Sequence, residues 1–136
     1  MSIIHDMIHT NTNQNVEVIN ITSNVNDIIR KHDITNGIVN ISTKHTTSSI
    51  MINEDEEGLK KDYAKFLEKI VPNDNYLHDR IDNNATSHLK AMLTTPTQTL
   101  PIIDGKISLG TWQSIFFVEL DGPRSNRTIN IMIIGD

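Results

Sequence analysis

The chain has 136 residues and a formal charge of −5, from 17 acidic and 12 basic side chains. This length fits one domain with one core, and the acidic excess argues against a protein that coats nucleic acid through phosphate contacts. The absence of cysteine excludes disulfides, thiolate nucleophiles and Cys-type zinc sites. No stretch approaches the roughly 20 apolar residues of a membrane span, and the amino terminus lacks a basic signal-peptide region. We therefore expect a cytoplasmic, single-domain protein over residues 1–136.

The first part of the chain is predicted to form strands around one helix. Residues 3–9 and 16–21 carry β-branched side chains in partial alternation, so they predict a β-hairpin across the polar stretch between them. Residues 25–32 place apolar side chains at helical spacing, and Thr22 or Ser23 is a candidate cap for this helix.

A strand and a second helix are expected next. Residues 37–43 follow a Thr-Asn-Gly turn and predict a strand. Asn53 is a good N-cap, and Glu56 three residues later completes a variant of the capping box. The helix is expected to stop at Pro72. It carries one apolar stripe, formed by Leu59, Tyr63, Phe66, Leu67 and Ile70.

A third helix is expected from about Asn83 to Leu93. Three of its side chains are predicted to face inward, namely Leu89, Met92 and Leu93.

The remainder of the chain reads as β-structure. Residues 97–103 and 106–110 flank Asp104-Gly105, a strong signal for a two-residue hairpin turn. Residues 113–120 and 127–135 flank a turn built on Asp-Gly-Pro. The fold class is therefore α+β, with mostly antiparallel sheets because the connections between successive strands are short.

Three of the six histidines stand in polar, turn-rich contexts: His45, His78 and His88. Imidazole is the commonest metal ligand and the usual acid–base group near neutral pH. On one continuous helix, His78 and His88 would lie about 15 Å apart, so the chain must bend between them if they share a site. His45 must then arrive by tertiary folding. Spacing alone leaves open the alternative that each is an ordinary hydrogen-bonding surface residue.

Several other polar residues have both a functional and a structural interpretation. Glu54 can take part in chemistry or simply complement the helix dipole. Asp62 falls outside the apolar stripe and is expected to be solvated, and Asp121 most simply initiates its turn. Arg124 and Arg127 follow this turn and are suited to capturing phosphate or carboxylate, although a pair of arginines near a hairpin tip is more often solvated.

Trp112 is the only tryptophan and is either core or pocket wall, while Gln113 alternates to the other face of its strand. The P-loop, GxGxxG and GxSxG motifs are all missing.

Taken together, several segments resemble the YjbQ-like family, also called the secondary thiamine-phosphate synthase family. The resemblance covers nearly the whole chain and is most specific in the LGTWQ…E…DGPR block. The matching segments are HTTSSIMINE (45–54), YLHD (76–79), NNATSHL (83–89), LPIIDGKISLGTWQSIFFVELDGPR (100–124) and the terminal IMIIG.

The resemblance implies a β-sandwich core with about three helices, packed as a homotrimer with a pocket near the subunit boundary. It also implies that His45, His78 and His88 bind a divalent transition metal, for which zinc is the best match to three imidazoles. Further residues match motif positions around that pocket: Glu54, Asp62, Asn84, Glu119, Asp121 and Arg124.

The function implied is a metal-dependent enzyme that acts on a small phosphorylated or carboxylated metabolite, with weak thiamine-phosphate synthase activity. The catalytic candidates are Glu54, Asp62 and Asp121. The substrate-binding candidates are Asn84, Glu119, Arg124, Trp112 and Gln113. Two alternatives stay open: a non-catalytic trimer that binds metal and a small anion, and a structural trimer stapled by its histidines.

Overall fold

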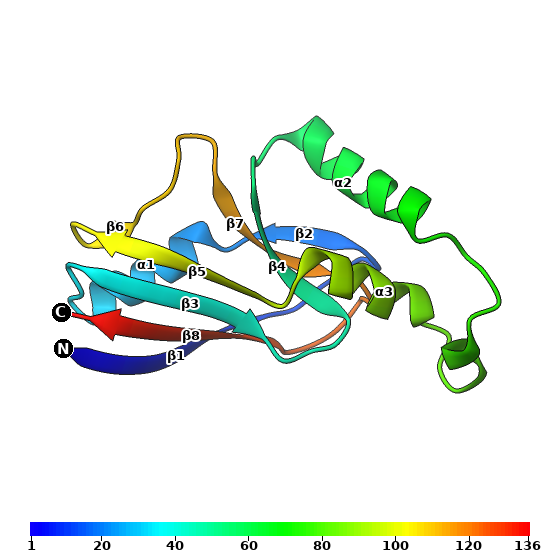
Figure 1. Ribbon diagram of the computed structural model, residues 1–136, viewed down its shortest axis with the longest axis horizontal. Helices are drawn as coiled ribbons and strands as arrows, with labels where there is room; N and C mark the ends of the chain where they lie inside the picture. Colours follow the sequence, from blue (N-terminus) through cyan, green and yellow to red (C-terminus); the bar gives the residue numbers. More distant parts are fainter.

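The computed structural model describes residues 1–136 and has the α+β fold that the sequence predicts. Figure 1 shows helix α1 behind the strands of sheet A, toward the end that holds both termini, and helices α2 and α3 at the opposite end. In chain order the elements are β1 (Ser2–Thr10), β2 (Glu17–Asn20), α1 (Thr22–Lys31), β3 (Gly37–Thr43), β4 (Ser48–Asn53), α2 (Glu57–Ile70), η1 (Leu77–Arg80), α3 (Ala85–Thr94), β5 (Thr97–Ile103), β6 (Lys106–Ile107), β7 (Ser114–Glu119) and β8 (Arg127–Gly135).

The strands form two antiparallel sheets. Sheet A has five strands in the order β1-β8-β3-β5-β6, and sheet B has three in the order β2-β7-β4. The predicted turn at Asp104-Gly105 joins β5 to β6, and both turn residues have positive φ, at 52° and 81°. This conformation is the one that a two-residue hairpin of this kind requires.

The predicted hairpin between residues 3–9 and 16–21 is wrong. Both strands exist, but β1 pairs with β8 in sheet A, whereas β2 pairs with β7 in sheet B. Likewise β7 and β8, on either side of the Asp-Gly-Pro turn, belong to different sheets. The connections β1–β2 and β7–β8 are short, but each passes from one sheet to the other, because the two sheets pack face to face on one core.

The molecule has three layers, namely sheet A, sheet B and the pair of helices α2 and α3, and a hydrophobic cluster lies between each two neighbouring layers. The larger cluster lies between the inner face of sheet A, the inner face of sheet B and helix α1; it includes Val25, Ile41, Ile115 and Ile131. The smaller cluster lies on the other face of sheet B, under helices α2 and α3. The outer face of sheet A is left uncovered.

Helix α1 has no side-chain cap, contrary to the prediction for Thr22 or Ser23. Its N-cap is Ile21, and Thr22 is the first helical residue. The Thr22 hydroxyl is occupied elsewhere, because it accepts a hydrogen bond of 2.9 Å from the backbone N–H of Ile115 on β7.

Helix α2 starts later than predicted. Its N-cap is Glu56, whose carboxylate accepts hydrogen bonds from the N–H groups of Gly58 and Leu59, whereas Asn53 ends strand β4. Of the predicted apolar stripe only Leu67 is buried, because the helix stands off from the sheet.

Helix α3 starts at Ala85, and the prediction that Met92 and Leu93 face inward is wrong. Both side chains are exposed, and the face turned to the protein instead carries Ala91 and the side chain of Lys90. None of the helices is long and apolar enough to span a bilayer.

Candidate functional site

The His78 and His88 rings lie together at the helical end of the molecule. Their centroids are 4.7 Å apart and their planes are close to perpendicular, at 84°. His78 belongs to the short helix η1, and the chain turns after Ile81 before α3 begins, so the bend that the sequence required is present.

Asn84 orients the His78 ring. Its Nδ2 donates a hydrogen bond of 2.8 Å to Oδ2 of Asp121, and its Oδ1 lies 2.9 Å from Nε2 of His78. A carboxylate only accepts hydrogen bonds, so the amide must turn its oxygen toward the imidazole. Nε2 of His78 is therefore the donor, and in the neutral ring the lone pair lies on Nδ1.

This use of Asn84 explains how helix α3 is capped. The Asn84 side chain forms no cap hydrogen bond to the helix. Instead, the carboxylate of Asp79 in η1 accepts a hydrogen bond of 3.0 Å from the N–H of Ala85. Asp79 therefore caps helix α3, and the side-chain amide of Asn84 is free to contact His78.

Arg124 completes this chain of contacts. Its guanidinium donates to Oδ2 of Asp121 at 2.8 Å, and its Nε donates to the backbone carbonyl of the same residue at 3.0 Å. The Asp121 side chain is mostly buried, whereas half of the Arg124 side chain is exposed. Part of the guanidinium thus remains available to solvent or to a ligand.

A cavity of about 510 Å³ opens beside the two rings. Its walls are mainly apolar around the imidazoles, a composition typical of small-molecule sites. The lining residues are Asn75, Tyr76, Leu77, His78, Ala85, His88 and Leu89.

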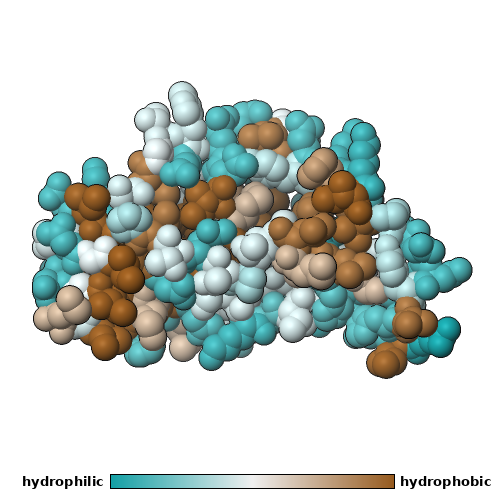
Figure 2. Space-filling view, in the orientation of Figure 1, coloured by the Kyte–Doolittle hydropathy of each residue, from teal (hydrophilic) through white to brown (hydrophobic).

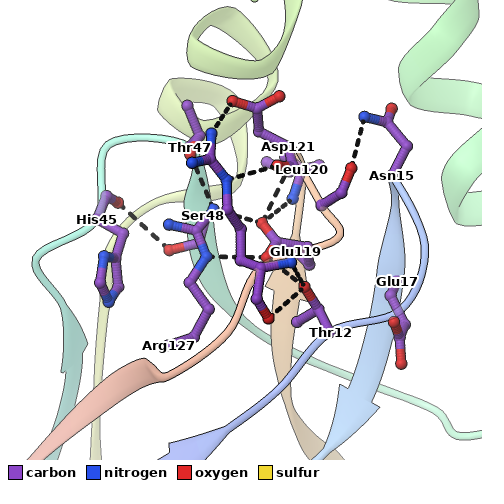
Figure 3. Close-up of polar contacts among 12 residues, drawn as sticks. Thr12, Asn15, Glu17, His45, Thr47, Ser48, Glu119, Leu120, Asp121 and Arg127 are labelled. Atoms are coloured by element: carbon purple, nitrogen blue, oxygen red, sulfur yellow. Dashed lines mark hydrogen bonds and ion pairs between the residues drawn. The ribbon is translucent and has the colours of Figure 1, made fainter.

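A buried ion pair supports the site from beneath (Figure 3). Glu119 is fully buried, and its carboxylate accepts hydrogen bonds from Nε of Arg127 at 2.8 Å and from Nη2 at 2.5 Å. It also accepts one from the hydroxyl of Thr12 at 2.7 Å and one from the N–H of Asp121 at 3.2 Å. This pair connects β7 of sheet B to β8 of sheet A and fixes the backbone that carries Asp121.

The pKa of Glu119 reflects this surrounding. Burial by itself would raise the pKa, but the hydrogen bonds from Arg127 and Thr12 outweigh burial and hold it below its usual value. The Glu119 carboxylate therefore stays charged, and both of its oxygens accept hydrogen bonds from protein groups. The sequence pairs Arg127 with Arg124 as a candidate for anion capture that is more often solvated, but Arg127 is buried against Glu119, because nothing in the local pattern shows which arginine meets a buried carboxylate. Thr12 was not singled out by the sequence.

Gly122 lies where the loop after β7 meets the loop after β1. A Cβ at this position would be 2.1 Å from the carbonyl oxygen of Gln14, so no larger residue fits. The Gly122 N–H donates to the carbonyl of Asn15 at 3.0 Å, and the N–H of Arg124 donates to the hydroxyl of Thr12 at 2.8 Å. These contacts hold the Asp-Gly-Pro-Arg turn in place.

His45 lies apart from the other two candidate ligands in this chain. Its Nε2 accepts a hydrogen bond of 3.0 Å from the N–H of Thr128, and it does not line the cavity beside His78 and His88. Burial lowers the pKa of His45, and the charge of Arg127 lowers it further, so the ring is held neutral. No group of three or more His, Asp or Glu side chains is arranged to hold a metal ion.

None of the other candidate residues lines the cavity: Glu54, Asp62, Asn84, Trp112, Gln113, Glu119, Asp121 and Arg124. Asp62 is exposed on α2, and the backbone carbonyl of Glu54 accepts a hydrogen bond from Tyr63.

The prediction that Trp112 is core or pocket wall is wrong, because the ring is 73% exposed in the loop before β7. Gln113 lies in the same loop and not on a strand face, and its side-chain oxygen accepts a hydrogen bond from the N–H of Gly110. Trp112 and Gln113 precede β7, and Glu54 follows the end of β4 that pairs with its start; these three therefore lie about 17 Å from the other end of β7, which leads to Asp121 and Arg124.

Comparison with known proteins assigns the chain to a family. The family model described as "UPF0047 protein YjbQ-like" matches residues 6–136. The chain belongs to the YjbQ-like UPF0047 family. A UPF0047 protein of Methanothermobacter thermautotrophicus is 48% identical to this YjbQ-like chain over 125 residues, which cover 91% of this chain and 87% of the relative. The UPF0047 protein YugU of Bacillus subtilis is 33% identical, over 91% of this chain and 94% of the relative.

Solved structures agree with this assignment. A YbjQ-like protein of unknown function from Sulfolobus solfataricus superposes with a TM-score of 0.96 at 39% identity, covering 99% of both chains. A hypothetical protein from Aeropyrum pernix gives a TM-score of 0.93 at 31% identity, covering 98% of this chain and 99% of that one. The YjbQ-like fold and family are thereby established.

Proposed function

We propose that the protein is a metal-dependent enzyme that acts on a small phosphorylated metabolite in the cavity beside His78 and His88. One observation carries the proposal: the Asp121–Asn84 pair dictates which nitrogen of His78 holds the proton. Such oriented imidazoles are typical of metal ligands and of acid–base catalysts, whose partner groups fix the ring and its tautomer.

The donor set fits a transition metal in part. His78 presents Nδ1, and the neighbouring His88 ring is held by no hydrogen bond to another protein group, so both can ligate. In the present arrangement His45 does not fit, because its Nε2 is occupied by the N–H of Thr128 and its proton must therefore sit on Nδ1. Zinc on all three rings, as the family resemblance implies, requires that this hydrogen bond be released.

When bound, a zinc or similar ion would supply Lewis-acid chemistry at a phosphate oxygen. Residues of the chain would bind the anionic group and line the cavity. Arg124 does not line the cavity but is joined to His78 through Asp121 and Asn84, and its half-exposed guanidinium would hold the anionic group of a metabolite that extends beyond the cavity. Ala85 and Leu89 of α3 give the cavity an apolar wall against which the metabolite would pack.

Weak thiamine-phosphate synthase activity belongs to this proposal. In that reaction a pyrimidine pyrophosphate joins a thiazole phosphate, and thiamine phosphate and pyrophosphate are released. Pyrophosphate is usually bound as a complex with Mg²⁺, which prefers oxygen ligands, whereas imidazole ligands favour zinc. This mismatch favours a different principal substrate for the site.

The second candidate is a non-catalytic protein that binds a metal and a small anion. One observation favours it: Glu54 and Asp62, the expected proton carriers, do not line the cavity. We further propose that the working form is a homotrimer, as the family resemblance implies.

The two candidates are separated by assay of the metal-loaded protein with the two thiamine precursors and with a panel of phosphorylated metabolites. Product formation that is lost in His88→Ala supports the enzyme. Saturable binding of a phosphorylated metabolite without any product, lost in the same variant, supports the binding protein. Rescue of a thiamine-phosphate-synthase-deficient host by both the wild type and His88→Ala would separate the thiamine activity from this site.

A further inference from the structure

Lys90 of helix α3 is the one buried lysine of the chain. It is 8% exposed, whereas every other lysine is half-buried or exposed. It lies on the face of α3 that is turned to the protein, together with Ser87 and Ala91. Lysine is almost never buried in this way without a partner of opposite charge, because removing an ammonium group from water is costly.

The side chains of α3 are distributed in the reverse of the usual order. Met92 and Leu93 are 72% and 51% exposed, and Figure 2 shows hydrophobic residues gathered over this helix. A helix on a protein surface normally turns its apolar side inward and its charged residues toward water. The position of Lys90 therefore does not follow from the amphipathic pattern of the helix.

Two contacts with the protein fix how α3 is turned. Near its carboxyl end, the hydroxyl of Thr94 donates a hydrogen bond of 2.8 Å to Oγ of Ser49 on β4. At its amino end, Asn84 donates to Asp121 at 2.8 Å. Lys90 lies between these two contacts, one turn before Thr94 on the same side of the helix. A long helical side chain leans toward the amino end of its helix, which here is the end that meets Asp121.

Lys90 has no acidic partner in the chain. Its Nζ forms no ion pair with any Asp or Glu side chain. The two carboxylates at this end of sheet B already have cationic partners, since Glu119 is paired with Arg127 and Asp121 with Arg124. Lys90 thus adds a buried positive charge that no side chain of the protein balances.

The ammonium group of Lys90 is nevertheless open to a small ion. Every fully buried side-chain nitrogen or oxygen of the chain has a hydrogen-bond partner, so Nζ, which has none, keeps contact with solvent. The aliphatic stem is enclosed by protein and only the charged tip reaches water. A charge with such low-dielectric surroundings attracts an oppositely charged ion more strongly than the same charge in open water.

We infer that the ammonium group of Lys90 binds the phosphate group of the metabolite. Lysine is a compact point charge that suits a tetrahedral phosphate, whereas a planar carboxylate is better matched by the fork of an arginine. Lys90 follows the candidate metal ligand His88 by two residues, and it adds a second cation to Arg124. The inference rests on the proposed function for the identity of the ligand, and it names the group that would select phosphorylated metabolites.

The test is calorimetric titration of the purified full-length chain with inorganic phosphate. Lys90→Met removes the charge and keeps an unbranched side chain that can fill the same space. We expect this variant to bind phosphate about 10- to 100-fold more weakly than the wild type. Lys61→Met is the matched control, because it removes the same charge from an exposed position on α2, and it should bind phosphate as the wild type does.

Urea unfolding of the same proteins gives a second readout. Phosphate should raise the free energy of unfolding of the wild type and of Lys61→Met, and leave that of Lys90→Met unchanged. Without phosphate, Lys90→Met should be at least as stable as the wild type, because no acidic group loses a partner. A clear loss of stability without phosphate would mean that the protein itself holds the ammonium group, and it would overturn the inference.

A wild type that binds no phosphate, or a Lys90→Met variant that binds it as tightly as the wild type, also overturns the inference. If circular dichroism shows that the variant is misfolded, a crystal structure of the wild type with phosphate decides, since the anion must lie against Nζ of Lys90. Elemental analysis of the same samples tests the proposed function separately. Phosphate binding through Lys90 in a wild type that carries no metal would retain this site and overturn the metal-dependent enzyme.

Discussion

Asn84 donates a hydrogen bond of 2.8 Å to Asp121 from a position that lies 37 residues earlier in the chain. This contact joins the start of α3 to the turn after β7, and through the other end of the amide it reaches His78. Through this relay of contacts Asp121 determines which nitrogen of a neutral His78 ring carries the proton, although the carboxylate does not touch the ring.

Replacing Asn84 by Ala should weaken zinc binding about 10- to 100-fold, as the loss of such an orienting partner does in metal sites. The amide provides no cap hydrogen bond, so α3 should persist in the variant. Isothermal titration with zinc measures the effect. Asn83→Ala, an exposed neighbour, is the control and should bind as the wild type does. Equal affinities for both variants would show that the relay has no influence on the metal.

His88→Ala should abolish metal binding while the fold is retained. The His88 ring contacts His78, and its removal leaves a single imidazole in the cavity, too few ligands for a stable zinc site. Untagged wild type should carry close to one transition-metal ion per chain, measured by elemental analysis. His32→Ala removes an imidazole elsewhere, on the C-cap of α1, and should leave the metal content unchanged. Wild-type metal content in His88→Ala would remove this ring from the site.

Glu119→Ala should destabilise the protein by about 3–5 kcal/mol, because it leaves the guanidinium of Arg127 buried without its partner. The exposed pair between Arg30 and Asp27 provides a comparison of the same chemistry, and Asp27→Ala should cost less than about 1 kcal/mol. Urea unfolding followed by circular dichroism measures both. A small effect for Glu119→Ala would mean that water reaches the Arg127 side chain.

Asp6 should make stability depend on pH in the acid range. The hydrogen bond from His32, together with one from the backbone N–H of Met7, lowers the pKa of Asp6 from 3.8 to about 2. The unfolded chain therefore takes up this proton near pH 4 and the folded chain only near pH 2, so the stabilisation is present above pH 4 and is lost as the pH falls to about 2.

The variant Asp6→Asn tests this dependence. It should lose at most about 2 kcal/mol at neutral pH and approach the wild type near pH 2, with the difference shrinking between those values. Urea unfolding at a series of pH values measures it, with Asp27→Asn as the exposed control. A difference between wild type and Asp6→Asn that is the same at every pH would assign the effect to packing instead of charge.

Local sequence patterns determined which segments form helices and strands. β-branched alternation marked β1, β3 and β8, and Asp104-Gly105 marked the β5–β6 hairpin, because backbone conformation at these positions depends on neighbouring residues. The requirement for a bend between His78 and His88 also followed from helix geometry alone. The family resemblance added residues such as Asn84 and Glu119 without stating what they contact.

Only the tertiary structure decided which strands pair and which polar groups meet. The segments after β1 and after β7 each cross to another sheet, because burial of apolar faces across the whole molecule outweighs the preference of neighbouring strands to pair. The same long-range packing buries Arg127 against Glu119 and leaves Arg124 half-exposed, although the two arginines are only three residues apart. A charged side chain is buried where a partner reaches it, and the partner's position is set by the fold as a whole.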